Sequence, residues 1–128
     1  MASERRIPVI EVEVEGVVSA QLTEEVAGIS ASSAVTRFWG MCDYTLTFED
    51  SAHEERLLVG IDGDLALLAK DTLQGMWQLP NDRLEGQQEF RVGGQPTSMD
   101  RRLLHPQSTV IDIVEAWLAF SDAGWESC

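Results

Sequence analysis

The chain has few cysteines and no long apolar run, and each scarcity excludes a class of protein. Its only cysteines are Cys42 and Cys128 in 128 residues, and neither lies in a CxxC pair. We therefore expect a semi-buried thiol and a frayed terminal one rather than a disulfide, redox or zinc site. No apolar stretch approaches the roughly 20 residues that span a bilayer, and no secretory signal follows the charged N-terminus. These absences predict a cytoplasmic protein without a membrane partner.

Recognisable catalytic motifs are missing as well. The sequence has no Gly-x-Ser-x-Gly elbow, no phosphate-binding loop and no His-Glu-x-x-His helix. The histidines, His53 and His105, lack a catalytic context, so we expect ordinary surface or turn residues. Residues 62–64 (Asp-Gly-Asp) resemble the start of a calcium loop, but residues 65–69 are apolar where further ligands are needed. We predict no catalytic residue, no metal, no cofactor and no enzymatic activity.

Basic residues are scarce too, and the resulting charge is the strongest feature of the composition. Twenty-two acidic residues outnumber nine basic ones, of which Lys70 is the only lysine, and the formal net charge is −13. Such a chain is repelled by nucleic acid and by anionic membranes and is attracted to basic partners. Acidity can also serve solubility alone. Charge by itself leaves both interpretations open.

Alternating patterns predict most of the strands. Residues 7–15 alternate apolar and acidic side chains, which is the period of a half-buried strand, and Pro8 favours a place at the sheet edge. Residues 34–39 and 44–48 are predicted to be further strands. The acidic side of the first strand carries Glu11, Glu13 and Glu15.

A two-residue turn is the clearest local signal. Asp62-Gly63 joins two apolar runs, residues 56–61 and 64–69, as in a β-hairpin whose turn needs positive φ. Both runs are apolar on both faces, so we expect them at the sheet centre with each side covered. The remaining short elements are two strands and a turn, at residues 76–79, 89–92 and 93–96.

Two helices are predicted from caps and apolar stripes. A short one starts at Thr23 and is interrupted by Gly28. A longer one has Thr109 as its N-cap, an apolar stripe over residues 110–118 and a stop at Gly124.

The order of these elements predicts the fold class. At 128 residues, 44% of them hydrophobic, the chain can form one core, and no repeat or linker divides it. We predict a single α+β domain over residues 1–128. In it an antiparallel β-sheet meander packs against a short N-terminal helix and a long C-terminal helix. Trp117 is expected to anchor the core, Trp125 to fold back on the body, and Trp39 and Trp77 to be core or interface residues.

A series of short motifs between Leu57 and Trp125 carries a family resemblance. In chain order they are Val-Gly-Ile-Asp-Gly-Asp (59–64), Gly75-Met76-Trp77, Glu-Phe-Arg-Val-Gly-Gly-Gln (89–95), a polar link, the helix 110–120 and Asp122-Ala123-Gly124. This stretch resembles the first of the Imm families, immunity proteins of bacterial polymorphic-toxin systems. The sequence departs from the family pattern at Gln78, at Arg91-Val92, and before the last helix, where Arg101, Arg102 and His105 replace acids.

The resemblance implies an α+β domain that binds and blocks a cognate toxin domain, typically a nuclease or a nucleic-acid deaminase. It implies no cofactor, and the matching positions keep a fold, so they do not transfer as a binding site. Toxins that act on nucleic acid need a basic groove, and an inhibitor that presents carboxylates can occlude it. We therefore expect a bacterial, cytoplasmic toxin inhibitor that is monomeric or forms a 1:1 protein–protein complex.

Acidic surfaces are the candidate toxin-binding sites. The densest runs from Asp43 to Asp64, where seven acids accompany Arg56 alone. If the strands pair as a meander, the turn at 49–55 and the turn at 62–64 lie at opposite ends of the sheet, and we prefer the first. The row of Glu11, Glu13 and Glu15 is a second candidate. The predicted contact residues are Glu49, Asp50, Glu54, Glu55, Asp62, Asp64 and Trp77.

Two other classes of function stay open. The first is an adaptor or regulatory module that binds proteins without inhibiting them and whose acidity serves solubility. Genomic position discriminates it, because an immunity gene should lie directly downstream of a gene for a large secreted protein with a C-terminal toxin domain. The second is a small enzyme, which requires a cleft that joins His53 or His105 to acids.

Overall fold

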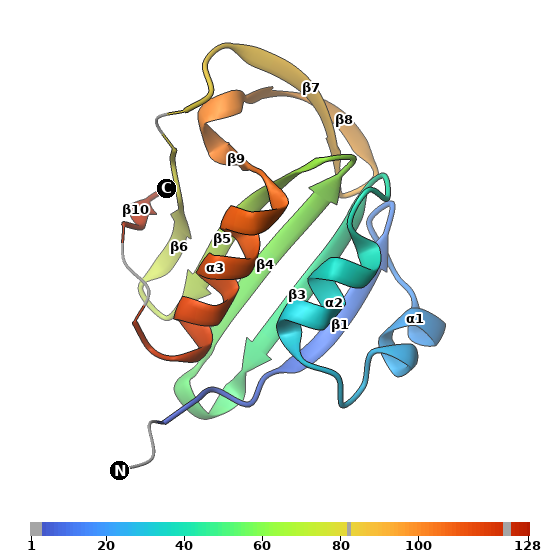
Figure 1. Ribbon diagram of the computed structural model, residues 1–128, viewed down its shortest axis with the longest axis vertical. Helices are drawn as coiled ribbons and strands as arrows, with labels where there is room; N and C mark the ends of the chain where they lie inside the picture. Colours follow the sequence, from blue (N-terminus) through green and yellow to red (C-terminus); the bar gives the residue numbers. More distant parts are fainter. Residues whose placement is uncertain (1–3, 82, 122–123) are drawn as a thin grey trace.

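An antiparallel sheet with helices against it organises the chain (Figure 1). The computed structural model describes residues 4–81, 83–121 and 124–128. The strands are β1 (Val9–Val14), β2 (Val17–Val18), β3 (Tyr44–Asp50), β4 (Glu55–Asp62), β5 (Leu65–Thr72), β6 (Gly75–Gln78), β7 (Gln87–Val92), β8 (Gln95–Asp100), β9 (Leu104–His105) and β10 (Glu126–Ser127). The helices are α1 (Ala20–Glu25), α2 (Ala31–Phe38) and α3 (Gln107–Leu118), with 3-10 turns η1 (Ser51–His53) and η2 (Arg101–Leu103). The α+β class and the antiparallel sheet are as predicted.

The predicted meander consists of β3, β4, β5 and β6. The strand order is β10-β6-β5-β4-β3-β1-β2, with β9 paired to β5, so the doubly apolar β4 and β5 are central as expected. The turn between them differs from the prediction by one residue. Asp62 still pairs with Leu65, so the turn consists of Gly63, at φ +73°, and Asp64. Glycine accepts the positive φ that a tight hairpin needs at this position.

Strand β1 follows its alternating pattern. Ile10 and Val12 are buried in the core, whereas Glu11 is exposed on the opposite face. Pro8 predicted an edge strand, but the edge strand is β2, and β1 lies next to it. Strand β2 pairs with β1 at only two positions, so the rest of β1 has no strand on that side. Glu15 does not continue the acidic row. At φ +52° it belongs to the turn that reverses the chain between β1 and β2.

The predicted strand at residues 34–39 is wrong, because this segment lies in helix α2 and the residue that follows it. The side chain of Ser30 caps the helix by accepting a hydrogen bond from the N–H of Ser33 at 3.1 Å. The buried residues recur at helical spacing and are Ala31, Ala34, Val35 and Phe38. Strand propensity is a weak preference here, and the cap and the apolar helical face outweigh it.

Helix α1 is short, as predicted, but it begins at Ala20 rather than at Thr23. Ser19 is the N-cap, and its hydroxyl accepts a hydrogen bond from the N–H of Leu22 at 3.2 Å. Thr23 has a different role. Its hydroxyl accepts a hydrogen bond from the N–H of Val12 at 3.0 Å and so ties the helix to β1.

Helix α3 buries its predicted face but has different ends. Val110, Val114, Trp117 and Leu118 are its buried residues. Pro106 occupies the N-cap position without a side-chain hydrogen bond, so Thr109 lies inside the first turn. The helix ends at Leu118 after 12 residues, and Phe120, at φ +58°, reverses the chain before Gly124 is reached.

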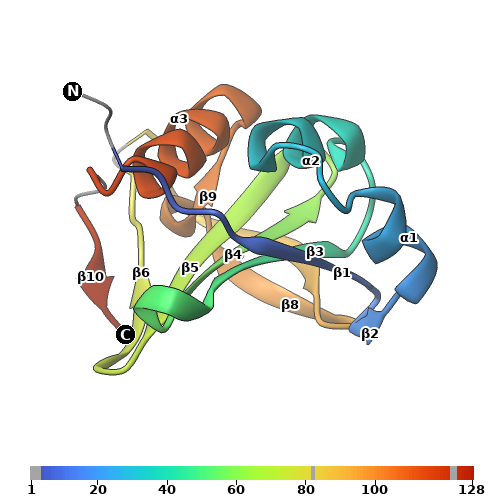
Figure 2. The same ribbon diagram turned by 90° about the horizontal axis from the view of Figure 1, so that it is seen from below.

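The two sides of the sheet are covered differently. Helices α2 and α3 lie on one side, and the hairpin of β7 and β8 lies on the other (Figure 2). This hairpin covers the end of the sheet near Gly60, where a Cβ would lie 3.4 Å from Val92 Cγ2. Strand β8 also replaces part of the predicted turn at 93–96, because Gln95 and Pro96 already pair with β7. At the opposite end of this face, Glu49 and Arg56 are exposed.

The tryptophans pack largely as predicted. Trp117 is fully buried, and Trp39 and Trp125 are partly buried against the core. Trp125 folds back on the body, with the Lys70 ammonium 5.0 Å from its ring centroid. Within the described ranges no helix has the length and apolar character needed to cross a membrane.

Candidate protein-binding site

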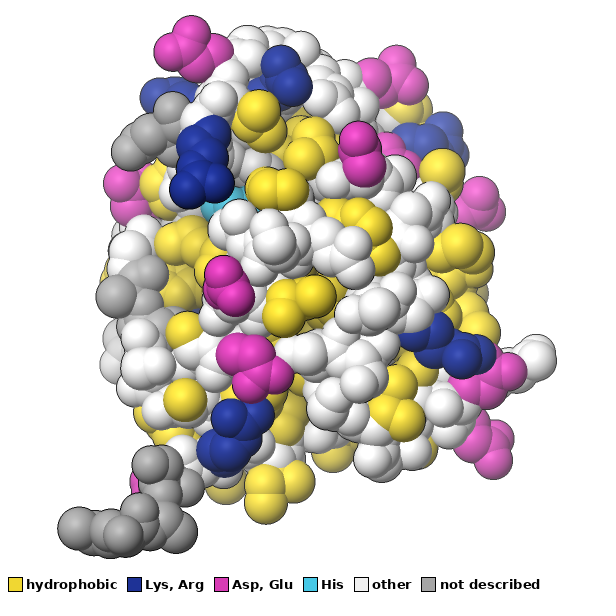
Figure 3. All heavy atoms as spheres, viewed as in Figure 1, with side chains coloured by type: hydrophobic (Ala, Val, Ile, Leu, Met, Phe, Trp, Pro, Cys, Tyr) yellow, Lys and Arg dark blue, Asp and Glu magenta, His cyan; other side chains and the backbone are white. Residues whose placement is uncertain are grey.

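Ion pairs within the molecule leave an excess of carboxylates at its surface. Most basic side chains are paired with acids, namely Arg5, Arg6, Arg37, Arg56, Lys70 and Arg102. Within residues 4–81, 83–121 and 124–128, the acidic side chains without a hydrogen-bond or ion-pair partner are Glu4, Glu11, Glu13, Glu15, Glu24, Glu49, Glu54, Asp64, Glu85, Glu89, Asp112 and Glu126. Acidic side chains are sparse over the centre of the helical side and lie mainly around its rim (Figure 3).

Two turns at one end of the sheet enclose what we call the acidic hollow. The β3–β4 turn and the β5–β6 turn line it, and its volume is about 380 Å³. Its charged side chains include Glu49, Glu54, Arg56 and Asp71. The strand register brings them together, because Arg56 lies opposite Glu49 on β3 and opposite Asp71 on β5. Residues directly opposite one another point to the same face of a sheet.

Apolar side chains border the acidic hollow. Val9 of β1 lies opposite Glu49 and is 71% exposed, and Leu73 in the β5–β6 turn is 76% exposed. Met76, opposite Asp71, is also exposed. Partner proteins obtain affinity mainly from desolvated apolar contacts, whereas surrounding charges set the approach and the orientation. The hollow and its border contain both kinds of group.

Arg56 is the only described cation that lines the hollow. Its hydrogen bond to Asp71, together with the nearby carboxylates of Glu49 and Glu11, raises the pKa of Arg56 above its ordinary value. One guanidinium thus lies among three carboxylates. The local excess of negative charge favours the approach of a basic surface.

Beneath the hollow, Arg6 forms a buried cluster with two of the predicted contact acids. Its Nη1 donates to Oδ2 of Asp50 at 2.9 Å, and its Nη2 lies 3.4 Å from Oε1 of Glu55. The rings of Trp117 and Phe120 pack against its guanidinium, with centroids 4.6 and 4.3 Å away. Asp50 is only 4% exposed. Lys70 Nζ also lies 3.9 Å from Oε1 of Glu55, so Arg6 and Lys70 together balance these two acids, which are not free surface charges.

Hydrogen bonds hold both carboxylates of this cluster in place. Burial works to raise the pKa of Asp50, but hydrogen bonds from Arg6 and His53 outweigh burial and lower that pKa. Glu55 Oε1 accepts a hydrogen bond from the indole N–H of Trp117 at 2.9 Å. A tryptophan N–H and an arginine on the same carboxylate leave it little freedom to turn toward a partner.

The other predicted contact residues do not line the hollow. Asp62 is at the far end of β4, as expected, and its Oδ2 accepts a hydrogen bond from the N–H of Arg91 at 2.9 Å. Asp64 beside it is exposed. Trp77 is half-buried on β6, and its indole N–H donates to Oγ1 of Thr72 at 3.2 Å.

The acidic row on β1 divides between two places. Glu11 shares a face with Glu49, because Val9 opposite Glu49 is two residues away on the same strand. Glu13 continues this face toward β2, where it lies opposite Val18. Only the first two glutamates of the row can therefore act together with the acidic hollow, since Glu15 lies in the turn.

The two histidines have different environments. His53 is exposed, with Nδ1 2.8 Å from Oδ2 of Asp50, and it contacts the ring of Phe120. His105 is 2% exposed, so its prediction as a surface or turn residue is wrong. Its Nε2–H donates to the carbonyl of Leu79 at 2.6 Å, and its Nδ1 is buried without a partner. Burial lowers the pKa of His105.

His105 lines a groove of about 450 Å³ together with Asn81, Arg83 and Thr109. No carboxylate among the described residues lines that groove. The thiols also differ from expectation in one respect, because Cys42, predicted to be semi-buried, is exposed like Cys128. No group of three or more His, Cys, Asp or Glu side chains in the described ranges is arranged to hold a metal ion.

Sequence reasoning missed Asp71, Leu73 and Val9 as parts of the site. The sequence misplaced Asp71, because the predicted turn at Asp62-Gly63 sets Ala69 opposite Arg56, whereas the observed turn at Gly63-Asp64 sets Asp71 there. Leu73 gives no signal, since an apolar residue between strands is as compatible with burial as with exposure. The burial of Asp50 and Glu55 was also missed, because their partner Arg6 lies far away in the sequence.

Comparison with known proteins identifies no relative: no family model, no curated protein and no solved structure matches the chain. The resemblance to the immunity-protein family therefore depends on the quoted motifs alone.

Proposed function

We propose that the protein is an immunity protein that binds and neutralises a toxin domain by docking the acidic hollow against the toxin's basic surface. The observation that carries the proposal is the hollow itself. Unpartnered Glu11, Glu49 and Glu54 lie beside exposed Val9 and Leu73 at the end of the sheet face that no hairpin covers. The partner is a basic nuclease or nucleic-acid deaminase domain, bound in a 1:1 complex in the cytoplasm of the producing cell.

Electrostatics supports this function over binding to nucleic acid. The carboxylates present charges of the same sign as phosphates, so they are attracted to a groove that evolved to hold phosphates. Long-range attraction of this kind raises association rates by about 10- to 1,000-fold at low ionic strength. Fast capture matters for an inhibitor, because free toxin damages the cell that makes it.

A charge-reversal experiment tests the site. The variant Glu11→Lys/Glu49→Lys/Glu54→Lys replaces only unpartnered surface acids and leaves Asp50 and Glu55 in place. We expect its association with the toxin domain encoded directly upstream to slow by about tenfold or more at low salt. The difference should shrink as salt screens the charges. Stopped-flow association rates and survival of cells that express the toxin are the two readouts.

The matched control is Glu85→Lys/Glu89→Lys/Asp112→Lys, which changes the net charge equally with acids that are also unpartnered. Equal slowing by both triple variants would show that total charge, not the hollow, steers the toxin. If the first variant associates with the toxin at an unchanged rate and still protects cells, the hollow is not part of the interface. If the protein binds the neighbouring domain without protecting cells, it is an adaptor instead.

A further inference from the structure

Exposed apolar side chains concentrate at one groove on the edge of the sheet. The described part of the chain exposes eight large hydrophobic side chains, and four of them, Ile7, Val9, Val18 and Ile29, line this groove. It lies between β1 and the segment that joins α1 to α2, and its volume is about 720 Å³. We call it the edge groove. Ile7 is 91% exposed, and exposed apolar side chains that gather at one groove mark an interaction site, whereas scattered ones do not.

The backbone of β1 is open at one residue beside this groove, Ile10. Val12 directs its N–H to Thr23 Oγ1 and its carbonyl to the N–H of Ser19, both away from β3. Alternate residues of a strand direct their N–H and carbonyl to the same edge, so Ile10 also directs both groups away from β3. No hydrogen bond from another described residue reaches these groups of Ile10. One donor and one acceptor of β1 are thus left open at the edge.

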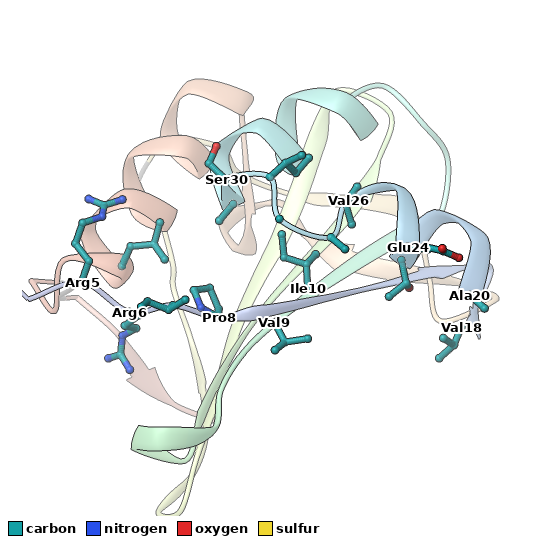
Figure 4. A pocket seen from close by; sticks show the side chains of 17 residues that line it. Arg5, Arg6, Pro8, Val9, Ile10, Val18, Ala20, Glu24, Val26 and Ser30 are labelled. Carbon is teal, nitrogen blue, oxygen red and sulfur yellow. The ribbon is translucent and has the colours of Figure 1, made fainter.

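Side chains form the walls of the edge groove. Ile10 points toward Val26, and Val9 points to the opposite side of the strand (Figure 4). Ala27 and Ile29 continue the apolar wall beyond Val26. An apolar wall beside an open strand edge is the arrangement in which an extended peptide adds a strand.

We propose that the edge groove binds an extended segment of a partner protein, which pairs with β1 at Ile10 as an additional strand. Ile10 offers two backbone hydrogen bonds, and the absent N–H of Pro8 ends the ladder on one side. The wall accepts apolar side chains at alternate positions of the segment. Arg5 and Arg6 also line the groove, but each forms an ion pair, with Glu115 and Asp50 respectively. Glu24 lines the groove without a partner for its carboxylate, so the segment carries a lysine or arginine at that end.

A second copy of this chain fits the groove less well than a basic partner segment. Antiparallel pairing of two β1 strands around Ile10 places Glu11 of each copy opposite Val9 of the other, so this register gives Glu11 no cation as its cross-strand neighbour. Each chain also has a formal net charge of −13. Charge complementarity therefore selects a partner strand with positive charges.

Peptide binding to the full chain tests this inference. The probe is the blocked heptapeptide Lys-Val-Thr-Val-Thr-Val-Lys, and its twin carries N-methyl groups on alternate backbone amides. NMR titration should shift the amide signals of residues 9–11 and 27–30 with the first peptide and leave them unchanged with the twin. The twin retains every side chain, so the difference measures backbone pairing. An absent shift, or equal shifts with both peptides, would overturn the proposal.

Two variants that change only exposed residues complete the test. Ile7→Ser/Ile29→Ser alters the edge groove, and Leu73→Ser/Met76→Ser alters exposed apolar residues elsewhere. The first variant should bind the peptide with about tenfold lower affinity, and the affinity of the second should be unchanged. Equal weakening would show non-specific apolar binding. Sedimentation of the free protein tests whether a second copy of the chain occupies the groove instead. A dimer that is lost in Ile7→Ser/Ile29→Ser but not in the other variant would show that it does.

This surface and the acidic hollow can fail separately. If the peptide binds but no toxin partner exists, the inference about the edge groove is supported and the proposed function is contradicted. If the protein neutralises a toxin through Glu49 and Glu54 but shows no backbone-dependent peptide binding, the proposed function is supported. The inference about the edge groove is then contradicted.

Discussion

Arg6 and Asp50 are separated by 44 positions in the chain and form a buried ion pair, with Nη1 2.9 Å from Oδ2. The pair joins the N-terminal segment to the end of β3, and the backbone carbonyl of Trp117 accepts a further hydrogen bond from Arg6 Nε at 2.7 Å. It therefore holds together three parts of the chain directly below the acidic hollow. It also explains why charge alone overestimates the acids available to a partner.

The first prediction concerns this ion pair. Arg6→Met leaves the buried Asp50 without its arginine partner, near the half-buried Glu55, and should lower the free energy of unfolding by about 3 kcal/mol. Arg5→Met is the control, because the Arg5–Glu115 pair is largely exposed and should contribute at most about 0.5 kcal/mol. Urea denaturation monitored by tryptophan fluorescence measures both. Equal small losses would mean that the buried pair does not stabilise the fold.

The second prediction concerns pH. Burial lowers the pKa of His105 in the folded protein below its ordinary value of 6.5, so the unfolded chain binds this proton more readily. When the pH is well above 6.5, His105 is neutral in both states and has no effect on the free energy of unfolding. As the pH falls below 6.5, the unfolded chain takes up the proton first, and the folded protein becomes progressively less stable. His105→Gln can keep a donor to the Leu79 carbonyl and removes the titration. We expect urea unfolding between about pH 7 and pH 5 to lose less stability in this variant than in the parent protein.

A third prediction addresses the close contact between two turns. A Cβ on Gly16 would lie 2.5 Å from the carbonyl oxygen of Gly93, and Gly16 has φ +82°. Gly28 has nearly the same φ, +84°, but has nothing within 4 Å of an added Cβ. Gly28→Ala should cost about 1 kcal/mol from backbone strain alone. Gly16→Ala should cost about 2 kcal/mol more, because the turns must separate. Thermal unfolding measures the stability of both variants, and the difference between their losses gives the contribution of the contact between the turns.

The fourth prediction concerns the thiols. Cys42 and Cys128 are both exposed in the folded protein. Both should therefore react with a thiol reagent such as DTNB at rates close to those of the urea-unfolded chain. The variants Cys42→Ser and Cys128→Ser show which thiol gives each phase of the DTNB reaction. A thiol that reacts only after unfolding would contradict the exposed position found for that residue.

Much of the fold follows from local pattern. The Asp62-Gly63 signal, the alternation of β1 and the apolar stripe of α3 each depend on residues close together in the chain, and each predicts an element that is present. The period of apolar residues determines which side of a strand or helix is buried, and that constraint is local.

Local pattern fails where distant residues decide the outcome. Residues 34–39 have strand propensity, but the cap at Ser30 and the sheet beneath them select helix α2. The site shows the same limit. Glu49 and Glu54 are surface acids, as charge pattern predicted. Asp50 and Glu55, which neighbour them in the chain, form ion pairs with Arg6, and Glu55 also pairs with Lys70.

The sequence by itself determined the net charge, the central hairpin, the half-buried alternation of β1 and the acidic turn at 49–55. Only the tertiary structure decided which of those acids remain unpaired, that Asp71 and Leu73 join them, and that His105 is buried. The physical reason is that composition and period act within a few residues, whereas ion pairing and burial depend on strand register and on contacts between segments far apart in the chain.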